Sequence, residues 1–289
     1  MSIFFRIVRD NRDFFCTADT APKFFVGRRV PYESNIGLYN IFGSSQLKKL
    51  NYDPANYQAE FGFWAEFIDP TAACEGRNFL TLNTYDRAAF TFGFTQFAAH
   101  VPDGDFIQYF HTLLGEPEAA DYFPTLELIA GRINKVDGPS PVVLETATTT
   151  QPLMNYLNPT LDEVEDQEVI AAAKFVHWTT EHRPARLVQI KVMIHAYRGF
   201  MRRADSRGLI DGRTADQCCV IADILHHGRG GKIAWSLISD AVNSSDPFGN
   251  LIAIGAPKWN ERKKTLKNKI RANPNMMART WSSAAGDFV

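Results

Sequence analysis

The sequence has almost no net charge. Its 289 residues include 31 lysines and arginines against 32 aspartates and glutamates, which gives a formal net charge of −1 at pH 7. A chain with this balance produces no overall field that would gather nucleic acids or anionic membrane surfaces. We therefore expect neither nucleic acid nor a membrane as a partner.

Long hydrophobic runs are also missing. No stretch approaches the roughly 20 uninterrupted apolar residues that a membrane-spanning helix needs. The opening residues, Met1-Ser2-Ile3-Phe4-Phe5-Arg6, become charged before the apolar part of a signal peptide could form. The sequence therefore predicts no signal peptide and no export by the general route.

Cysteine is scarce, with four residues in the whole chain. Cys218 and Cys219 are adjacent and cannot easily form a disulfide with each other. Together with Cys16 and Cys74 they also lack the paired C-x-x-C spacing of a structural zinc site. We expect buried thiols, no disulfide scaffold, no metal and no cofactor.

Phenylalanine is abundant, with 22 residues that are concentrated before residue 125. The hydrophobic fraction of 45% is enough to build one large core or two modest ones, so the chain is expected to fold. Dense aromatic side chains usually form a core, but they can also line a carbohydrate cleft, where rings stack on sugar faces.

Hydrophobic periodicity predicts a helix that begins at Tyr57. Its apolar stripe continues through Phe61, Trp64 and Ile68, and Asp69-Pro70 should end it, which places Glu66 in its last turn. Residues 1–50 are irregular or β-rich in pattern. We interpret them as an N-terminal extension packed on a main domain of residues 51–289.

After the first helix the hydrophobic residues recur every second position, as in a β-strand. Phe90, Phe92 and Phe94 alternate with small polar residues, which predicts a strand in a small hairpin or sheet over residues 79–97. Helical spacing returns afterwards and dominates the rest of the chain. The expected fold class is mainly α (α+β), with two helical lobes around the small sheet. Further helices are expected from residue 106 to 113, over 118–133, 184–206, 214–227 and 258–271, with a loop over 136–160.

Two carboxylic acids in this region suit glycoside hydrolysis, which needs one acid to protonate the leaving oxygen and one carboxylate to act at the anomeric carbon or its water. Glu66 follows Phe63 and Trp64, and burial among aromatic rings would favour the protonated form of a general acid. Asp86 lies in a polar turn that would keep it ionised. Such residues are also commonplace as helix-end and turn groups, and that structural interpretation stays open.

The order of these elements resembles the family 46 chitosanases of the lysozyme superfamily. In that family an Ala-Glu pair at a helix end is followed by an Asp-Gly-Arg-Gly-Tyr-Thr-x-Gly stretch. The resemblance implies a two-lobed lysozyme-like fold with a cleft, Glu66 as the acid, Asp86 as the base and Thr91 as the residue that positions the water. The matching positions here are Ala65-Glu66, Asp86, Phe90, Thr91 and Gly93.

The likeness extends over roughly residues 60–235 and supplies candidate substrate contacts. By resemblance Asp105 would bind an amino sugar; as a helix N-terminal residue it could equally be structural. Tyr85 and Arg87 flank the candidate base, but Asp86-Arg87-Ala88-Ala89 lacks two glycines and the arginine of the family's stretch. His227 lies in a His-His-Gly segment like one in the family. Adjacent helical histidines point about 100° apart, so a metal pair is not expected. Further matches are Asp103-Gly104-Asp105, Tyr122-Phe123-Pro124-Thr125-Leu126, Gly208-Leu209 and Asp223-Ile224-Leu225-His226-His227-Gly228.

These observations lead to one leading function and two alternatives. We expect an inverting glycoside hydrolase, acting as a monomer on a β-1,4-linked amino-sugar polysaccharide, with chitosan as the first substrate. A peptidoglycan-degrading muramidase, either an endolysin or a toxin, is the first alternative. A non-catalytic carbohydrate-binding protein on the same fold is the second. Action in the periplasm or outside the cell would require an unconventional delivery route, such as phage lysis or a contact-delivered toxin.

Overall fold

The chain forms two compact units, and each contains two separate stretches of sequence. The computed structural model describes residues 2–41 and 47–289. The first unit holds residues 1–51 and 78–192, and the second holds residues 52–77 and 193–289. The expected division into an extension of residues 1–50 and one domain of residues 51–289 is therefore corrected, because the N-terminal strands form one sheet with residues 82–98.

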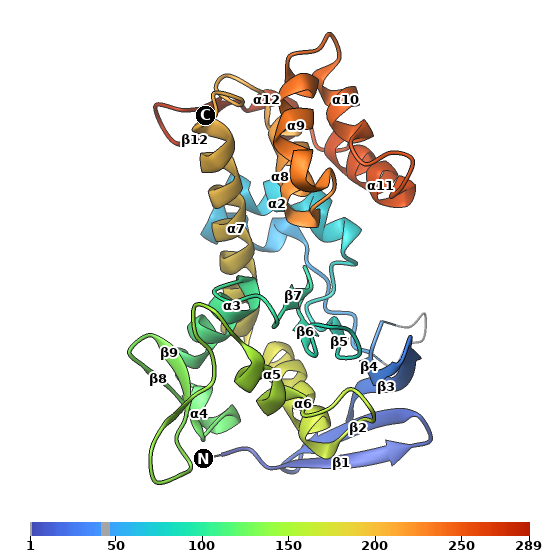
Figure 1. Cartoon of the computed structure of the whole chain (residues 1–289), viewed down its shortest axis with the longest axis vertical. Coiled ribbons are helices and arrows are strands. Elements are labelled where there is room, and N and C mark those ends of the chain that lie inside the picture. The colour runs from blue at the N-terminus through green and yellow to red at the C-terminus, as the bar shows by residue number, and fades with distance from the viewer. Residues whose placement is uncertain (1, 42–46) are drawn as a thin grey trace. The chain divides into compact units, whose positions relative to one another are not determined.

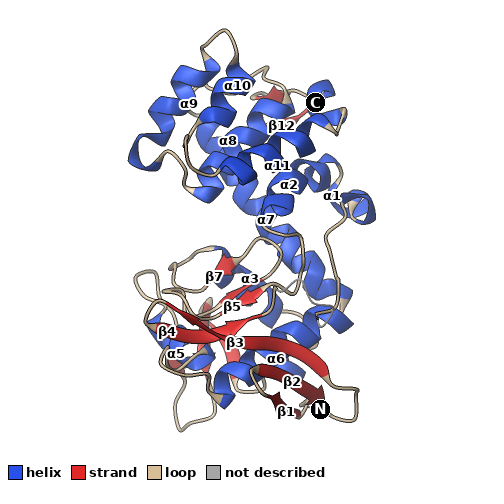
Figure 2. Ribbon diagram, turned by 90° about the vertical axis from the view of Figure 1, so that its right-hand side faces the viewer, coloured by secondary structure: helices blue, strands red, loops and turns tan. Residues whose placement is uncertain are grey.

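A seven-stranded antiparallel sheet is the framework of the first unit, and its strands lie in chain order (Figure 2). In β2 the buried residues alternate, with Phe14, Cys16 and Ala18 facing inward. Tyr39 of the fourth strand pairs with Asn83 of the fifth and so connects the N-terminal strands to the later hairpins. The strands are β1 (Phe5–Asp10), β2 (Asp13–Ala18), β3 (Phe24–Tyr32), β4 (Asn35–Tyr39), β5 (Leu82–Asn83), β6 (Thr91–Phe92) and β7 (Phe97–Ala98).

Helix α6 (Asp166–Glu181) packs against β1, β2 and β3 and supplies the centre of the first unit's core (Figure 1). The Phe175 ring lies 5.1 Å from Phe110 and 5.4 Å from both Phe90 and Phe92, measured between ring centroids. The dense phenylalanines are therefore core residues here. The other elements are α3 (Asp105–Leu114), α4 (Ala119–Tyr122), α5 (Gln151–Leu157), the start of α7 (Arg183–Asp205), and a small sheet of β8 (Leu126–Ile129), β9 (Arg132–Lys135) and β10 (Val142–Val143).

The second unit is helical, with a short C-terminal hairpin. Helix α2 packs against α8 and α11, and Phe288 of the hairpin lies 4.7 Å from the Phe67 ring of α2. Its elements are η1 (Pro54–Asn56), α1 (Gln58–Phe61), α2 (Phe63–Cys74), the end of α7, α8 (Ala215–His227), η2 (Gly231–Ile233), α9 (Ala234–Val242), α10 (Pro247–Ala253), α11 (Asn260–Arg271), α12 (Asn275–Ala278), β11 (Trp281–Ser282) and β12 (Asp287–Phe288).

The mixed α and β class is confirmed, and so are the helices expected near residues 106–113, 184–206, 214–227 and 258–271. The helix expected over residues 118–133 is wrong. Only one turn forms before Pro124, and the chain then makes the hairpin β8–β9, whose turn has positive φ at Ala130 and Gly131. The strand expected through Phe94 is shorter, because Gly93 turns with a φ of 97°. No helix in the described part of the chain is long and apolar enough to span a membrane.

Candidate functional site

Glu66 lies in the first turn of α2, and the expected position in the last turn of a helix is corrected. Gly62, with a φ of 55°, separates α1 from α2 and restarts the helix at Phe63. The helix then continues through Pro70 to Cys74. Proline has no N–H, so Pro70 cannot make the helical hydrogen bond to the carbonyl of Glu66.

Three side-chain amides hold the half-buried carboxylate of Glu66. The Gln58 Nε2 donates to Oε1 at 2.7 Å, while the Asn273 Nδ2 and the Asn275 Nδ2 each donate to Oε2 at 2.8 Å. Glu66 makes no ion pair with the residues that the structure describes. Two oxygens fixed by neutral donors from three chain positions give this carboxylate a defined orientation.

The aromatic residues beside Glu66 do not surround it as expected. Trp64 and Phe67 are buried in the core of the second unit, and the Trp64 indole N–H donates to Asp287 at 2.9 Å. The guanidinium of Arg198 lies 4.9 Å from the Trp64 ring centroid. The apolar pocket expected around the Glu66 carboxyl group is therefore replaced by an amide cage.

Asp86 belongs to a tightly fixed loop over residues 84–89 in the first unit. Its Oδ1 accepts from the backbone N–H of Ala88 at 2.9 Å, and its carbonyl accepts from the N–H of Ala89. Side-chain amides hold the loop backbone as well. Asn158 donates to the carbonyls of Thr84 and Ala89, both at 3.0 Å, and Asn35 donates to the carbonyl of Tyr85 at 3.0 Å.

The loop also contains one strained backbone conformation, at Ala89, and leaves no room for a side chain at Gly37. Ala89 has a φ of 54°, a conformation that non-glycine residues rarely adopt unless the surroundings impose it. A Cβ at Gly37 would lie 2.6 Å from the Thr84 Oγ1 and 2.8 Å from the Tyr85 nitrogen, so only glycine fits against the loop. This degree of fixation presents Asp86, which is half-buried, at one defined place.

Glu168 supports the loop from α6 and is fully buried. Its Oε1 accepts from the Thr84 hydroxyl and, at 3.1 Å, from the backbone N–H of Leu38, whereas its Oε2 has no hydrogen-bond partner among the described residues. Burial raises the pKa of Glu168 to about 7, against the opposing effect of these two hydrogen bonds.

The raised pKa of Glu168 leads to a prediction about how the free energy of unfolding depends on pH. Between about pH 4.5 and 7 the folded protein holds a proton that the unfolded chain releases, so the Glu168 contribution to stability falls as the pH rises. The variant Glu168→Gln cannot ionise. Its free energy of unfolding relative to the wild type should rise by about 2–3 kcal/mol between pH 5 and pH 8. Urea titrations at both pH values measure this, with the exposed Glu127→Gln as control. A flat difference for Glu168→Gln would contradict the prediction.

The other residues expected near Asp86 occupy different environments. Tyr85 packs against Tyr32 at a centroid distance of 5.0 Å, and burial raises its pKa, whereas Arg87 is exposed. Thr91 was expected to face a cleft, but it is only 4% exposed because β6 lies between β5 and β7. We therefore do not assign Thr91 a water-positioning role. Asp105 opens α3 and is half-buried there.

His227 ends α8 in the second unit, where Gly228 caps the helix in the left-handed conformation. Its ring lies 4.5 Å from that of Trp259, edge to face, and its Nδ1 has no partner among the described residues. Burial, assisted by the charge of Arg262, lowers the pKa of His227. His226 turns instead to the Tyr197 ring and to Glu75, so the two histidines do not share a ligand.

A buried ion network lies beside these histidines and was not foreseen. Asp223 and Arg229 are fully buried and form an ion pair, and Arg262 contacts Asp223 at 2.7 Å and Glu75 at 2.5 Å. Thr71 donates to Asp223 at 3.0 Å. Burial alone would raise the pKa of Asp223, but the charges of Arg229 and Arg262 outweigh it and lower that pKa. The network ties α2, α8 and α11 together.

The predicted site residues fall into two groups. Tyr85, Asp86 and Arg87 share the fixed loop of the first unit, and Glu66 has its amide cage in the second unit. Sequence reasoning missed the residues that fix both acids. The Asn273-Pro274-Asn275 segment was a usable signal, because a turn there places two side-chain amides close together, where they can bind one carboxylate.

Within residues 2–41 and 47–289, no group of three or more histidine, cysteine, aspartate or glutamate side chains is arranged to hold a metal ion. Cys16, Cys218 and Cys219 are buried free thiols, and Cys74 is a half-buried one. Comparison with protein-family models, with curated proteins and with solved structures finds no match for this chain.

Proposed function

We propose that the protein is a glycoside hydrolase with a lysozyme-like fold that cleaves a β-1,4-linked amino-sugar polymer. The observation that carries the proposal is the Glu66 carboxylate, held by three neutral amides from separate chain positions. Asp86 supplies the second carboxylate.

The setting of Glu66 differs from that of an ordinary surface glutamate. Surface carboxylates usually point freely into solvent or pair with lysine and arginine, and such pairs contribute little to stability. Glu66 makes no ion pair with the described residues, yet both of its oxygens are oriented. Fixed orientation is what a reacting carboxylate needs, because a misplaced group loses most of the advantage of proximity. The three amide contacts of Glu66 differ from the apolar setting expected of a general acid. The assignment of Glu66 as the acid and Asp86 as the base is therefore part of the proposal.

The fixed loop supports the role of Asp86. Hydrogen bonds from Asn35 and Asn158 immobilise its backbone, and Glu168 and Gly37 complete the packing beneath it. A carboxylate on a rigid turn can hold or activate water without moving during the reaction. We propose an inverting mechanism, in which Glu66 protonates the leaving oxygen and Asp86 activates the attacking water.

The decisive experiment incubates the purified protein with chitosan, chitin and peptidoglycan and follows the products by nuclear magnetic resonance. We expect chitosan fragments whose new reducing ends first appear as the α anomer, because inversion reverses the β linkage. First appearance of the β anomer would indicate retention. Cleavage of peptidoglycan alone would favour a muramidase, and saturable binding without cleavage would favour a carbohydrate-binding protein.

Asp105 is the proposed determinant for chitosan. A protonated amine on the sugar calls for a carboxylate partner, and a charge-assisted hydrogen bond is stronger than a neutral one. Peptidoglycan carries acetylated amines and has no such requirement. Cleavage of chitosan with a KM that does not rise on Asp105→Ala would remove this residue from the proposal while leaving the reaction in place.

A further inference from the structure

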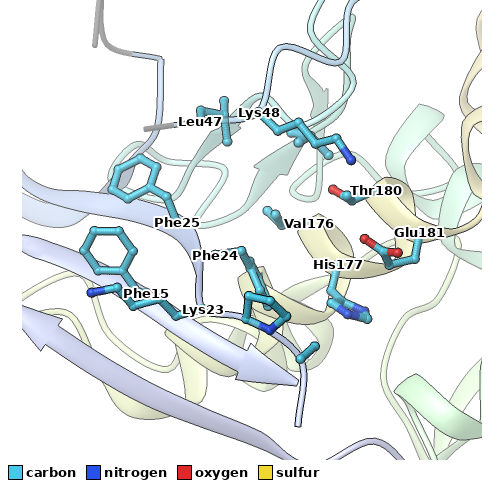
Figure 3. Close-up of a pocket in the computed structure, with 13 residues that line it drawn as sticks. Phe15, Lys23, Phe24, Phe25, Leu47, Lys48, Val176, His177, Thr180 and Glu181 are labelled. Atoms are coloured by element: carbon cyan, nitrogen blue, oxygen red, sulfur yellow. The ribbon is translucent and has the colours of Figure 1, made fainter. Parts of the chain in front are cut away.

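A separate pocket lies in the first unit between the N-terminal strands and α6 (Figure 3). It has a volume of about 580 Å³ and shares no lining residue with the loop that carries Asp86. Phe15 and Phe25 line one side, and Val176 of α6 faces them from the other. Leu47 and Leu80 complete the apolar wall.

The polar groups of this pocket are few and carry an excess of positive charge. Lys23 and Lys48 line it from two different segments, and Glu181 is the one acidic residue among the described lining residues. The Lys23 ammonium lies 4.8 Å from the Phe15 ring centroid. The ammonium of Lys48 is on the same side as the Thr180 hydroxyl and Glu181, away from Phe15 (Figure 3).

His177 lines the same side of the pocket. Its Nδ1 is hydrogen-bonded to the Tyr122 hydroxyl at 2.8 Å, and burial lowers the pKa of the imidazole, which favours the uncharged ring. When Tyr122 donates to Nδ1, the proton of the ring is on Nε2, which has no partner among the described residues. The pocket therefore has the Lys48 ammonium and the Thr180 hydroxyl near one end and the Phe15 and Phe25 rings near the other, with the Phe24 ring packed 5.4 Å from the uncharged His177 ring.

We propose that this pocket binds a small amphipathic carboxylate with an aliphatic chain. Pockets of about 300–1,000 Å³ with apolar walls and a few placed polar groups are typical of small-molecule sites. The chain would lie between Phe15, Phe25 and Val176, and the carboxylate would lie at Lys48 and Thr180. A sugar suits the pocket poorly, because the walls offer mainly carbon atoms to its many hydroxyl groups.

The test is calorimetric titration of the whole protein with dodecanoate below its micelle-forming concentration. Dodecanol and dodecyltrimethylammonium serve as probes with the same chain but no charge or the opposite charge. We expect saturable one-to-one binding of dodecanoate, weaker binding of the alcohol and none of the cation. Absence of saturable dodecanoate binding, or tighter binding of the cation, would overturn the proposal.

Three charge variants at the pocket sharpen the test because they act in opposite directions. Lys48→Gln should weaken dodecanoate binding by about two- to fivefold, Lys23→Gln should weaken it less, and Glu181→Gln should strengthen it. Lys264→Gln, an exposed lysine on α11, is the matched control and should change nothing. Equal affinities for all four variants would place the ligand elsewhere.

A filling variant tests the apolar part independently. Ala21 is exposed and lines the pocket, so Ala21→Trp should block the chain without disturbing the core. We expect it to abolish dodecanoate binding while the circular dichroism spectrum and the melting temperature stay at wild-type values. Wild-type affinity in a folded Ala21→Trp protein would contradict binding in this pocket.

Discussion

Glu66→Gln is expected to lower turnover of the cleaved polymer by about 10²- to 10⁴-fold, the usual contribution of a positioned acid or base. The amide keeps the shape of the side chain but can neither supply nor accept the proton. Gln58 can still donate to the remaining carbonyl oxygen, but the new NH2 group cannot accept from Asn273 and Asn275, so a small loss of stability is expected without loss of the fold. The measurement is kcat on the polymer that the wild type cleaves, with the melting temperature of each protein as a check on folding.

The matched controls for this experiment are exposed acids that form no hydrogen bond or ion pair with Glu66, Asp86 or the described side chains that hold them. Glu261→Gln on α11 in the second unit and Asp162→Asn in the first unit should keep wild-type kcat. Asp86→Asn should behave like Glu66→Gln. A Glu66→Gln protein with kcat within about twofold of the wild type would show that the reacting acid lies elsewhere.

Asp223→Asn should produce the largest loss of stability, about 3–5 kcal/mol, because it leaves the buried charge of Arg229 without its partner. The side chain keeps its size, so lost packing contributes little. Arg262 retains Glu75, at 2.5 Å, and is less affected. The free energy of unfolding from urea titration measures the effect, and the exposed Asp240→Asn should change it by less than about 0.5 kcal/mol.

A double variant separates the ion pair from other effects at this position. Arg229→Met removes the stranded charge, so Asp223→Asn combined with Arg229→Met should recover part of the stability lost in the single variant. If the losses of the two single variants simply add, the buried pair does not account for the effect.

The helices with a clear apolar stripe could be predicted from the sequence. α3, α7, α8 and α11 appear where periodicity placed them. Exceptions to local rules could not be foreseen: α2 continues through Pro70, and Ala130 adopts a positive φ in a hairpin where a helix was expected. At Pro70 the buried surroundings of α2 override local preference, whereas at the exposed Ala130 the two-residue turn of the hairpin sets the backbone conformation.

The positions of the two candidate acids could be read from the sequence, but their surroundings could not. The amides of Asn273 and Asn275 bind Glu66 across more than 200 residues of sequence. Asn158 binds the carbonyl of Thr84, in the loop of Asp86, across 74 residues. Such contacts depend on the path of the whole chain. The residues next to Glu66 in the sequence therefore predicted an aromatic pocket. Residues distant in the sequence instead surround its carboxylate with polar amides.

The interleaved units constrain how the protein is made. Helix α2 leaves the ribosome early, but α8 and α11, which cover its apolar face, follow only after residues 78–192 have been synthesised. During that interval Trp64 and Phe67 have no native partners from the later helices to shield them. The nascent chain therefore exposes the apolar face of α2 for most of its translation, and exposed apolar surface of this kind favours aggregation before folding is complete.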